Sequence, residues 1–326
     1  MAATNNKLNK AIQAKNDEFY TQYQDIEKEI QAYLAFNSDL FADKTVLCPC
    51  DDPGWSNFTA FFIENFEKMG LKELVSTCYA KDGRGKILRK TRNGKELALL
   101  NGDGDFNSDE LMHIRDKADY IITNPPFSLF REFMAWVFGG KSKFAVVCNK
   151  NCVTFKEIFP KIKSNEIWSG HRAWAGGMWF ETIDESDVDR VENGVNLKNV
   201  SAIWLTNIEH SRRYEPLPLL SMEQNLLKYP KLKDKQAYIQ YDNYNAIEVP
   251  ETKAIPCNYD GVMGVPISFL DKFDPDQFQI IGMDADVKNG NLSDLVVNDW
   301  GGKLDRGYIN GERKYSRLLI QFQKEA

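Results

Sequence analysis

The sequence predicts an α/β protein with a doubly wound, mostly parallel sheet and a smaller, irregular C-terminal domain. Up to about residue 150, short apolar runs typical of buried strands alternate with segments of helical spacing. This alternation is typical of parallel sheets. Beyond about residue 205 prolines interrupt the chain repeatedly, and Tyr and Asn become frequent. We therefore expect a first domain over residues 1–205 and a second over residues 206–326.

Apolar residues at helical spacing predict the helices, and short apolar runs predict the strands. Gly70 is expected to end the second helix as its C-cap, and residues 308–322 predict a closing hairpin that turns at Asn310-Gly311. The expected helices occupy residues 6–36, with an interruption at 17–22, then 56–69 and 107–117. The expected strands occupy residues 46–48, 74–75, 97–100, 120–123 and 144–148.

The composition is that of a soluble globular protein with a large core, because 326 residues include 43% hydrophobic and 27% charged side chains. No apolar run has the length of a membrane span, and the polar N-terminus lacks the apolar core of a signal peptide. We therefore expect a cytoplasmic protein with no membrane partner. The six cysteines lack the paired spacing of a zinc site, and the three histidines occur in unrelated contexts. No metal is expected.

The net charge of −6 argues against strong non-specific DNA binding but not against a local basic surface. Residues 81–95, here called the basic arm, contain seven Lys or Arg against one acid. Glycines at positions 83, 85 and 94 predict a protruding hairpin or loop. The alternative interpretation is a solvated charged hairpin that binds nothing.

The segment Asn124-Pro125-Pro126-Phe127 carries the strongest functional signal. It follows an apolar run that predicts a buried strand, and two prolines force the backbone out of the sheet as a rigid loop. Ser128 is then expected to cap a helix, so Asn124 lies at the carboxyl edge of the sheet. The side-chain oxygen of Asn124 and the carbonyl of Pro125 suit the two N–H bonds of an exocyclic amine, whose ring stacks on Phe127. A proline-rich turn with a capping Asn is the alternative.

This loop resembles the motif of amino-methyltransferases that use S-adenosylmethionine, and two acidic loops offer places for that cofactor. Cys50, Asp51 and Asp52 follow the first expected strand, where acids suit the ammonium and sulfonium groups better than a phosphate. An Asp pair that caps the next helix explains them equally well. In residues 102–106 a carboxylate can accept the adenine amine while Phe106 packs on the ring. Calcium is the alternative there, but the spacing does not continue as an EF-hand.

On these motifs the chain resembles the adenine-N6 DNA methyltransferases of the EcoRI modification-methylase family. The matching segments occur in family order and span most of the chain. They are residues 17–22, 50–53, 56–58, 102–106, 123–132, 154–160, 204–207 and 264–270.

The resemblance implies a Rossmann-like methyltransferase fold and a role for each segment. Asn124, Pro125, Pro126 and Phe127 form the catalytic loop, and the C-terminal domain supplies target recognition. The residues expected to bind the cofactor are Phe19, Tyr20, Thr21, Cys50, Asp51, Asp52, Asp103, Asp105 and Phe106. Within the basic arm, the residues expected to contact DNA are Arg84, Lys86, Arg89 and Lys90.

The implied activity is site-specific methyl transfer from S-adenosylmethionine to the N6 amine of an adenine flipped out of duplex DNA. Restriction-modification, or orphan or phage modification, is the expected setting. The same loop occurs in enzymes that methylate protein glutamine or guanine N2 of RNA, which is the alternative. We expect a monomer, with any cognate restriction endonuclease acting on the same site without an obligate complex.

Overall fold

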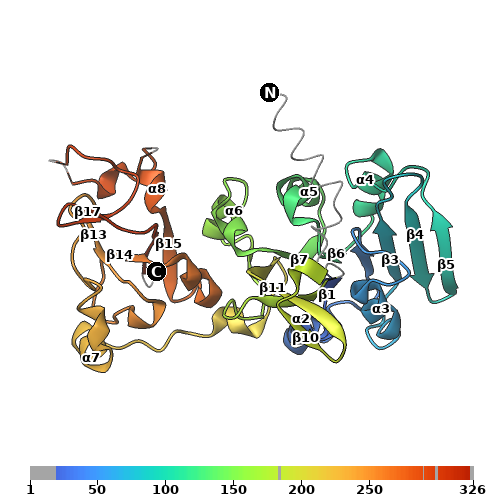
Figure 1. Ribbon diagram of the computed structural model, residues 1–326, viewed down its shortest axis with the longest axis horizontal. Helices are drawn as coiled ribbons and strands as arrows, with labels where there is room; N and C mark the ends of the chain where they lie inside the picture. Colours follow the sequence, from blue (N-terminus) through green and yellow to red (C-terminus); the bar gives the residue numbers. More distant parts are fainter. Residues whose placement is uncertain (1–19, 183–184, 289, 298–299, 324–326) are drawn as a thin grey trace. The chain divides into compact units, whose positions relative to one another are not determined.

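The computed structural model describes residues 20–182, 185–288, 290–297 and 300–323 (Figure 1). The chain divides into two compact units, residues 1–211 and residues 212–326. The sequence places its domain boundary between residues 205 and 206, slightly earlier in the chain. Each unit has its own sheets and its own buried core.

The main sheet of the first unit is mixed, with eight strands among the described residues. Its four central strands run parallel, and they are β3 (Glu73–Cys78), β2 (Thr45–Cys48), β6 (Tyr120–Thr123) and β7 (Lys143–Asn149). Antiparallel strands extend the sheet on both sides, so the expected parallel order holds only in the centre. In spatial order the strands are β5 (Gly94–Leu99), β4 (Lys86–Thr91), β3 (Glu73–Cys78), β2 (Thr45–Cys48), β6 (Tyr120–Thr123), β7 (Lys143–Asn149), β12 (Ala202–Thr206) and β8 (Trp168–Ser169).

The central strands are apolar runs because both faces of the sheet are covered. Every residue of β2 and β6 is buried. One face of the sheet packs against Ile30 of α2 (Tyr23–Phe36) and Phe61 of α3 (Asn57–Glu64) in a shared core. Figure 1 shows α2 (Tyr23–Phe36) and α3 (Asn57–Glu64) on one side of the sheet and α4 (Asp109–Arg115) and α5 (Phe130–Phe138) on the other. The predicted strands at 46–48, 120–123 and 144–148 are confirmed.

The second predicted helix is shorter than expected. Helix α3 ends at Glu64, and turns follow up to Gly70, which has a φ of 65°. Phe66 and Met69 remain buried beyond the end of the helix. Because these side chains still pack into the core, the apolar spacing continues where the helical hydrogen bonds have stopped. Gly70 therefore ends a turn, not a helix.

A second sheet of the first unit contains the most N-terminal described residues. Its strands, in spatial order, are β1 (Tyr20–Thr21), β9 (Met178–Glu181), β11 (Val195–Val200) and β10 (Arg190–Glu192). The loop before β9 is fixed by the buried carboxylate of Glu29 in α2. This carboxylate accepts the backbone N–H of His171 at 2.6 Å and that of Arg172 at 2.9 Å.

The second unit contains a four-stranded sheet and a separate short hairpin. The sheet consists of β13 (Ala246–Glu248), β14 (Val262–Val265), β18 (Leu318–Phe322) and β15 (Phe278–Met283). The hairpin of β16 (Tyr308–Ile309) and β17 (Glu312–Arg313) turns at Asn310-Gly311, as predicted. The expectation for 308–322 is wrong beyond this turn, because β18 pairs with β14 and β15 and not with β16.

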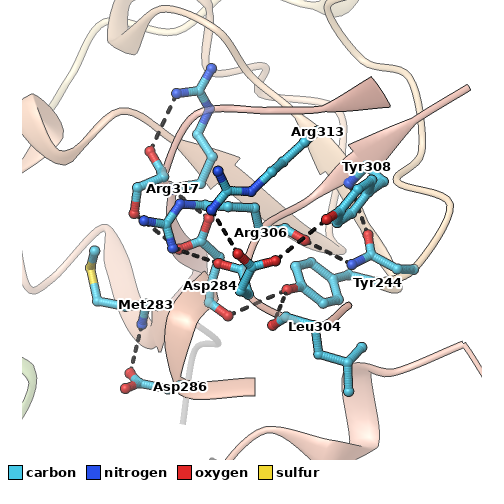
Figure 2. Close-up of polar contacts among 12 residues, drawn as sticks. Tyr244, Met283, Asp284, Asp286, Leu304, Arg306, Tyr308, Arg313 and Arg317 are labelled. Atoms are coloured by element: carbon cyan, nitrogen blue, oxygen red, sulfur yellow. Dashed lines mark hydrogen bonds and ion pairs between the residues drawn. The ribbon is translucent and has the colours of Figure 1, made fainter. Parts of the chain in front are cut away.

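Buried polar contacts hold the end of the chain in the second unit (Figure 2). Asp284 begins α8 (Asp284–Val287), and its carboxylate accepts the Ser316 hydroxyl at 3.0 Å and the Arg317 backbone N–H at 2.9 Å. The hydroxyl of Tyr244 donates to the Leu304 carbonyl at 2.7 Å. These bonds fix the segment that carries the hairpin onto the sheet.

Within the described ranges, none of the helices has both the length and the apolar character needed to cross a membrane.

Candidate active site

The Asn-Pro-Pro-Phe loop leaves the sheet at the carboxyl end of β6. Asn124 follows directly after Thr123, Pro125 is buried, and Phe127 is half-buried. Pro126 precedes a short 3₁₀ helix, η1 (Phe127–Leu129), and α5 begins only at Phe130. The predicted N-cap role of Ser128 is therefore wrong, because this residue lies exposed inside η1. The stiff prolines are followed first by a tight turn and then by the helix.

Asp51 connects the loop after β2 to the residue that precedes Asn124. Its carboxylate accepts the Ser56 hydroxyl on Oδ1 and the Thr123 hydroxyl on Oδ2, both at 2.6 Å. Ser56 is also the N-cap of α3 and accepts the Phe58 backbone N–H at 3.1 Å. One buried carboxylate thus ties together the end of β6, the loop after β2 and the start of α3.

The burial of Asp51 disfavours the charged form of its carboxyl group. The residue is buried, and this burial raises the pKa of its carboxyl to about 7, although the hydrogen bonds from Ser56 and Thr123 act in the opposite direction. Both carboxylate oxygens already accept hydroxyl groups of the protein. The geometry therefore gives Asp51 a positioning task, and its predicted contact with a cofactor stays a prediction.

Asp52 has different surroundings. Its side chain is partly exposed, and its carboxylate accepts the Gly54 backbone N–H at 2.7 Å and Lys86 Nζ at 3.0 Å. Burial raises its pKa, but the bonds from Gly54 and Lys86 outweigh this effect, so the pKa lies below its usual value. Asp52 is therefore an ionised carboxylate at neutral pH. Cys50, the other predicted residue of this loop, is partly exposed in the turn after β2.

The N-terminal motif lies beside the start of α3. Asn57 Nδ2 donates to the Thr21 carbonyl at 2.9 Å, and the rings of Tyr20 and Trp55 are 4.5 Å apart, edge to face. The Thr21 hydroxyl is buried and has no hydrogen-bond partner in the part of the chain that the structure describes. The structure thus brings Tyr20 and Thr21 to the loop of Asp51 and Asp52. Phe19, predicted with them, lies outside the described residues.

Strand β9 brings the N-terminal motif close to the Asn-Pro-Pro-Phe loop. Phe180 pairs with Thr21 across the β1–β9 ladder. Its ring lies 6.4 Å from that of Phe127, at 87°. Phe180 is fully buried, so it forms a fixed wall for the half-buried ring of Phe127. Sequence patterns gave no sign of this contact, which depends on the pairing of two short strands far apart in the chain.

The acidic loop 102–106 packs closely against the carboxyl end of β3. The Ala80 backbone N–H donates to the Asp103 carbonyl at 2.8 Å. Gly104 has a φ of 88°, and a Cβ there would collide with the Cys78 carbonyl oxygen. A Cβ on Gly85 would lie 2.6 Å from the same oxygen. Glycine is therefore needed at position 104 in the loop and at position 85, directly before β4, for the loop to pack against the edge of the sheet.

The predicted pair Asp105 and Phe106 is divided between surface and core. Asp105 is exposed, and its carboxylate accepts the Asn107 backbone N–H at 2.9 Å. Phe106 is buried, with its ring 5.4 Å from Phe133 and 6.0 Å from Trp136 of α5. The carboxylate thus faces solvent, and the phenyl ring fixes the loop to the helix that follows the Asn-Pro-Pro-Phe segment.

The basic arm does not protrude from the sheet. Strands β4 and β5 extend the main sheet at its edge, since β4 pairs with β3. Five of its seven cations have partners within the protein, which composition could not reveal. Lys86 pairs with Asp52, Arg89 with Glu73, Lys90 with Glu67 and Arg92 with Asp43, and Arg84 donates to the carbonyls of Leu99 and Leu100.

Sequence reasoning did not assign a function to several residues that shape the site. The sequence shows Ser56 and Thr123 only as parts of longer motifs and gives Trp55 no separate role. Phe180 belongs to an aromatic cluster that predicts either a stacking wall for a flipped base or core packing. A Ser before a helix is a visible N-cap signal, but nothing in the sequence reveals that Thr123 reaches Asp51. Among the described side chains, no group of three or more His, Cys, Asp or Glu residues is placed to hold a metal ion.

A rigid Asn-Pro-Pro-Phe loop at the carboxyl end of a central parallel strand, with acidic loops beside it, is typical of the amino-methyltransferases, and this is the class of the protein. The family described as adenine-specific methyltransferase EcoRI matches residues 7–323. The chain therefore belongs to the EcoRI family of adenine-specific methyltransferases.

The chain is similar over almost its whole length to three Type II methyltransferases. It is 39% identical to the Type II methyltransferase M.EcoRI of Escherichia coli, over 98% of this chain and 97% of the relative. It is 33% identical to the Type II methyltransferase M.MpnI of Mycoplasma pneumoniae, over 96% and 97% of the two chains. Identity to the Type II methyltransferase M.MgeORF184P of Mycoplasma genitalium is 32%, over 97% and 99%. Among solved structures, none matches the chain.

Proposed function

We propose that the protein transfers a methyl group from S-adenosylmethionine to the N6 amine of a specific adenine in duplex DNA. The observation that carries this proposal is the position of Asn124, at the carboxyl end of β6 and held through Thr123 by Asp51. Membership of a family of adenine-specific methyltransferases favours adenine over protein glutamine or RNA guanine.

The strand order supports a Rossmann-like, doubly wound arrangement around this site. The chain passes from β2 to its neighbour β3 and then crosses to β6 on the other side of β2. The order therefore reverses between β2 and β6, and ligands of open α/β sheets bind at the carboxyl ends of strands beside such a reversal. Asp51 follows β2 and Asn124 follows β6, so both lie beside this point.

The residues at this edge fit the cofactor. Asp52 is an ionised, partly exposed carboxylate that suits an ammonium or sulfonium group, and Asp105 is an exposed acceptor for an adenine amine. The buried hydroxyl of Thr21, which has no partner within the described residues, suits the polar methionine end. When bound, S-adenosylmethionine supplies an electrophilic methyl group. We assign it to Tyr20, Thr21, Asp52, Asp103 and Asp105, with Asp51 and Phe106 holding the loops in place.

The chemistry expected of the protein itself is positioning and electrostatic stabilisation. The side-chain oxygen of Asn124 and the carbonyl oxygen of Pro125 accept the two amine hydrogens of the target base, whose ring stacks on Phe127. These acceptors orient the nitrogen lone pair and stabilise the positive charge that grows on nitrogen as the methyl group moves. Phe180 behind Phe127, and Asp51 behind Thr123, hold the acceptors and the ring in fixed relation.

We further propose that the second unit recognises the target sequence and that the basic arm contacts DNA. Ion pairs at an exposed surface contribute only about 0–1 kcal/mol, so Lys86, Arg89 and Lys90 can exchange their acids for phosphates. The protein is proposed to act as a cytoplasmic monomer. The name Type II, carried by its relatives, supports a restriction-modification setting with an endonuclease that acts on the same site independently.

Transfer of labelled methyl groups to plasmid DNA, with base-resolution mapping of the product, tests the proposed function. N6-methyladenine in one recurring sequence context is the expected result, and it should be absent with the Asn124→Ala variant. Label on a protein glutamine or on RNA guanine, with unlabelled DNA, would contradict the proposal.

A further inference from the structure

Five lysines gather on one corner of the second unit, and we call this group the lysine surface. It lies on α7 (Met222–Lys228), on the 3₁₀ helix η5 (Pro230–Leu232) with the turn after it, and on a second segment near residue 253. Its members are Lys228, Lys231, Lys233, Lys235 and Lys253.

Side-chain contacts join the two segments into one surface. The ammonium groups of Lys228 and Lys253 lie over the ring of Tyr229, at 5.4 Å and 4.4 Å from its centroid. Lys235 and Lys253 also share the carboxylate of Glu251, at 2.6 Å and 2.9 Å. The lysines therefore come from separate parts of the sequence but share partners.

The framework beneath the lysine surface is well packed. Leu232 of η5 is fully buried, and so is Asn225 of α7. Asn225 Nδ2 and the Tyr238 hydroxyl donate to the same carbonyl, that of Ala254, at 3.3 Å and 2.7 Å. The backbone that presents the lysines is thus held in place without any bound partner.

The charge of this surface is not balanced within the molecule. Lys228, Lys231 and Lys233 are exposed, and none of them forms an ion pair with another described residue. The acids of these two segments are Glu251, which two lysines already share, Asp234, and Glu223, whose carboxylate is bonded to Ser221. Five cations therefore face three carboxylates at this corner, in a chain with a net charge of −6.

Two other groups of basic residues have more partners within the protein. The arginines near the C-terminal hairpin are paired with acids, Arg313 with Asp305 and Arg317 with Glu248. The cations of the basic arm that were expected to reach DNA also have intramolecular partners. The three exposed lysines at positions 228, 231 and 233 thus differ from both groups.

We infer that the lysine surface binds the phosphate backbone of duplex DNA. Ammonium groups on flexible stems bind phosphates as point charges without demanding a particular base. Contacts of this kind add affinity and hold the duplex, and they release counterions. The inference rests on the proposed function, since it takes DNA as the substrate, and it assigns to the second unit an electrostatic role separate from base recognition.

The test compares two triple variants of the full-length protein. Lys228→Ala/Lys231→Ala/Lys233→Ala removes the unpaired lysines. The control, Lys72→Ala/Lys117→Ala/Lys141→Ala, removes three exposed lysines that immediately precede or lie near the starts of β3, β6 and β7. The control positions are at the amino ends of parallel strands and so on the edge opposite Asn124. Both variants change the net charge by the same amount.

The dissociation constant for a duplex is measured over a range of salt concentrations. The first variant should weaken binding to all sequences alike and flatten the log–log salt slope by up to about 0.9 per lost contact. The control should keep the salt slope of the parent protein. A variant with arginine at positions 228, 231 and 233 should also have the parent slope. The sequence context of methylation and the affinity for S-adenosylmethionine should not change.

An unaltered slope in the first variant, or equal flattening in the control, overturns the inference. Loss of sequence discrimination at an unchanged slope also overturns it, because the surface would then read bases. Failure of the proposed function gives a different result: the parent protein itself would transfer no methyl group to DNA.

Discussion

The Thr123 hydroxyl donates a 2.6 Å hydrogen bond to Oδ2 of Asp51. The two residues are 72 positions apart in the chain, yet the bond joins the ends of the neighbouring parallel strands β2 and β6. Since Asn124 follows Thr123 directly, the buried carboxylate controls where the Asn-Pro-Pro-Phe loop begins. Ser56 holds the other oxygen of the same carboxylate, so the position of α3 is coupled to that of the loop.

Thr123→Val should lower kcat more than it changes the KM for S-adenosylmethionine. Valine keeps the shape of threonine but removes the donor to Asp51, and a buried acceptor without its donor costs about 1–3 kcal/mol of stability. Thr206→Val is the matched control, because the hydroxyl of Thr206 on β12 makes an equally short, buried bond to the carbonyl of Phe144 on β7. The control should lose comparable stability and keep its kcat, as steady-state kinetics and thermal unfolding will show. Equal kinetic losses in both variants would make the role of Thr123 purely structural.

Asp51→Asn should change the pH dependence of stability. The pKa of Asp51 is raised to about 7 in the folded protein, so the folded state holds a proton that the unfolded state has released between about pH 4 and pH 7. The stability from this group is complete below about pH 4 and is lost as the pH rises through 7. The free energy of unfolding of the parent, minus that of the variant, should therefore fall across this window by up to about 4 kcal/mol. Denaturant titrations at pH 4.5, 6 and 8 measure this difference, and a constant value would mean that Asp51 is not buried as a titrating acid.

Asn124→Ala should abolish turnover and leave S-adenosylmethionine binding intact. The side-chain oxygen of Asn124 is proposed to act on charge that develops only during methyl transfer. Loss of one such group costs about 3 kcal/mol, or roughly a hundredfold or more in rate. Single-turnover kinetics and calorimetry separate the two effects. Near-normal methylation by the folded variant would show that Asn124 is not a catalytic residue.

The parts of the fold that were predictable are those whose signal is local. The runs before Asp51 and Asn124 are continuously apolar because both sheet faces are covered, and this pattern identified both strands. The end of α3 was not predictable, because Phe66 and Met69 stay buried after the helical hydrogen bonds stop. Apolar spacing reports burial and not hydrogen bonding.

The parts of the site that were missed depend on contacts between distant segments. The predicted cofactor contact of Asp51 stays a prediction, whereas its burial and its bond to Thr123 become visible only when β2 and β6 are paired. The prediction that the basic arm protrudes is wrong because the partners of its cations, such as Glu73 for Arg89, lie outside the arm. A charge count along the sequence cannot reveal an ion pair across a sheet.

Gly85→Ala should disturb the acidic loop and weaken cofactor binding. A Cβ at this position would lie 2.6 Å from the Cys78 carbonyl oxygen and 2.7 Å from that of Asp103, so the loop must move away from β3. Overpacking of this kind costs about 1–3 kcal/mol. Gly102→Ala, within the acidic loop itself, is the control. The nearest atom to its Cβ would be 3.9 Å away. The melting temperature and the dissociation constant for S-adenosylmethionine should change for Gly85→Ala and stay near the parent values for Gly102→Ala.

Asp105→Ala should weaken S-adenosylmethionine binding without unfolding the protein. The residue is exposed and its carboxylate bonds only locally, to the Asn107 backbone N–H, so the variant loses little packing. A hydrogen bond between the cofactor amine and a carboxylate contributes about 1.5–3 kcal/mol, which corresponds to a roughly tenfold to hundredfold higher dissociation constant. Asp105→Asn keeps an acceptor oxygen and should lose less. Calorimetry with S-adenosylmethionine and with an analogue lacking the adenine amine decides the point: the analogue should bind the parent and Asp105→Ala equally. If the alanine variant binds S-adenosylmethionine as tightly as the parent does, the adenine ring lies elsewhere on the carboxyl edge.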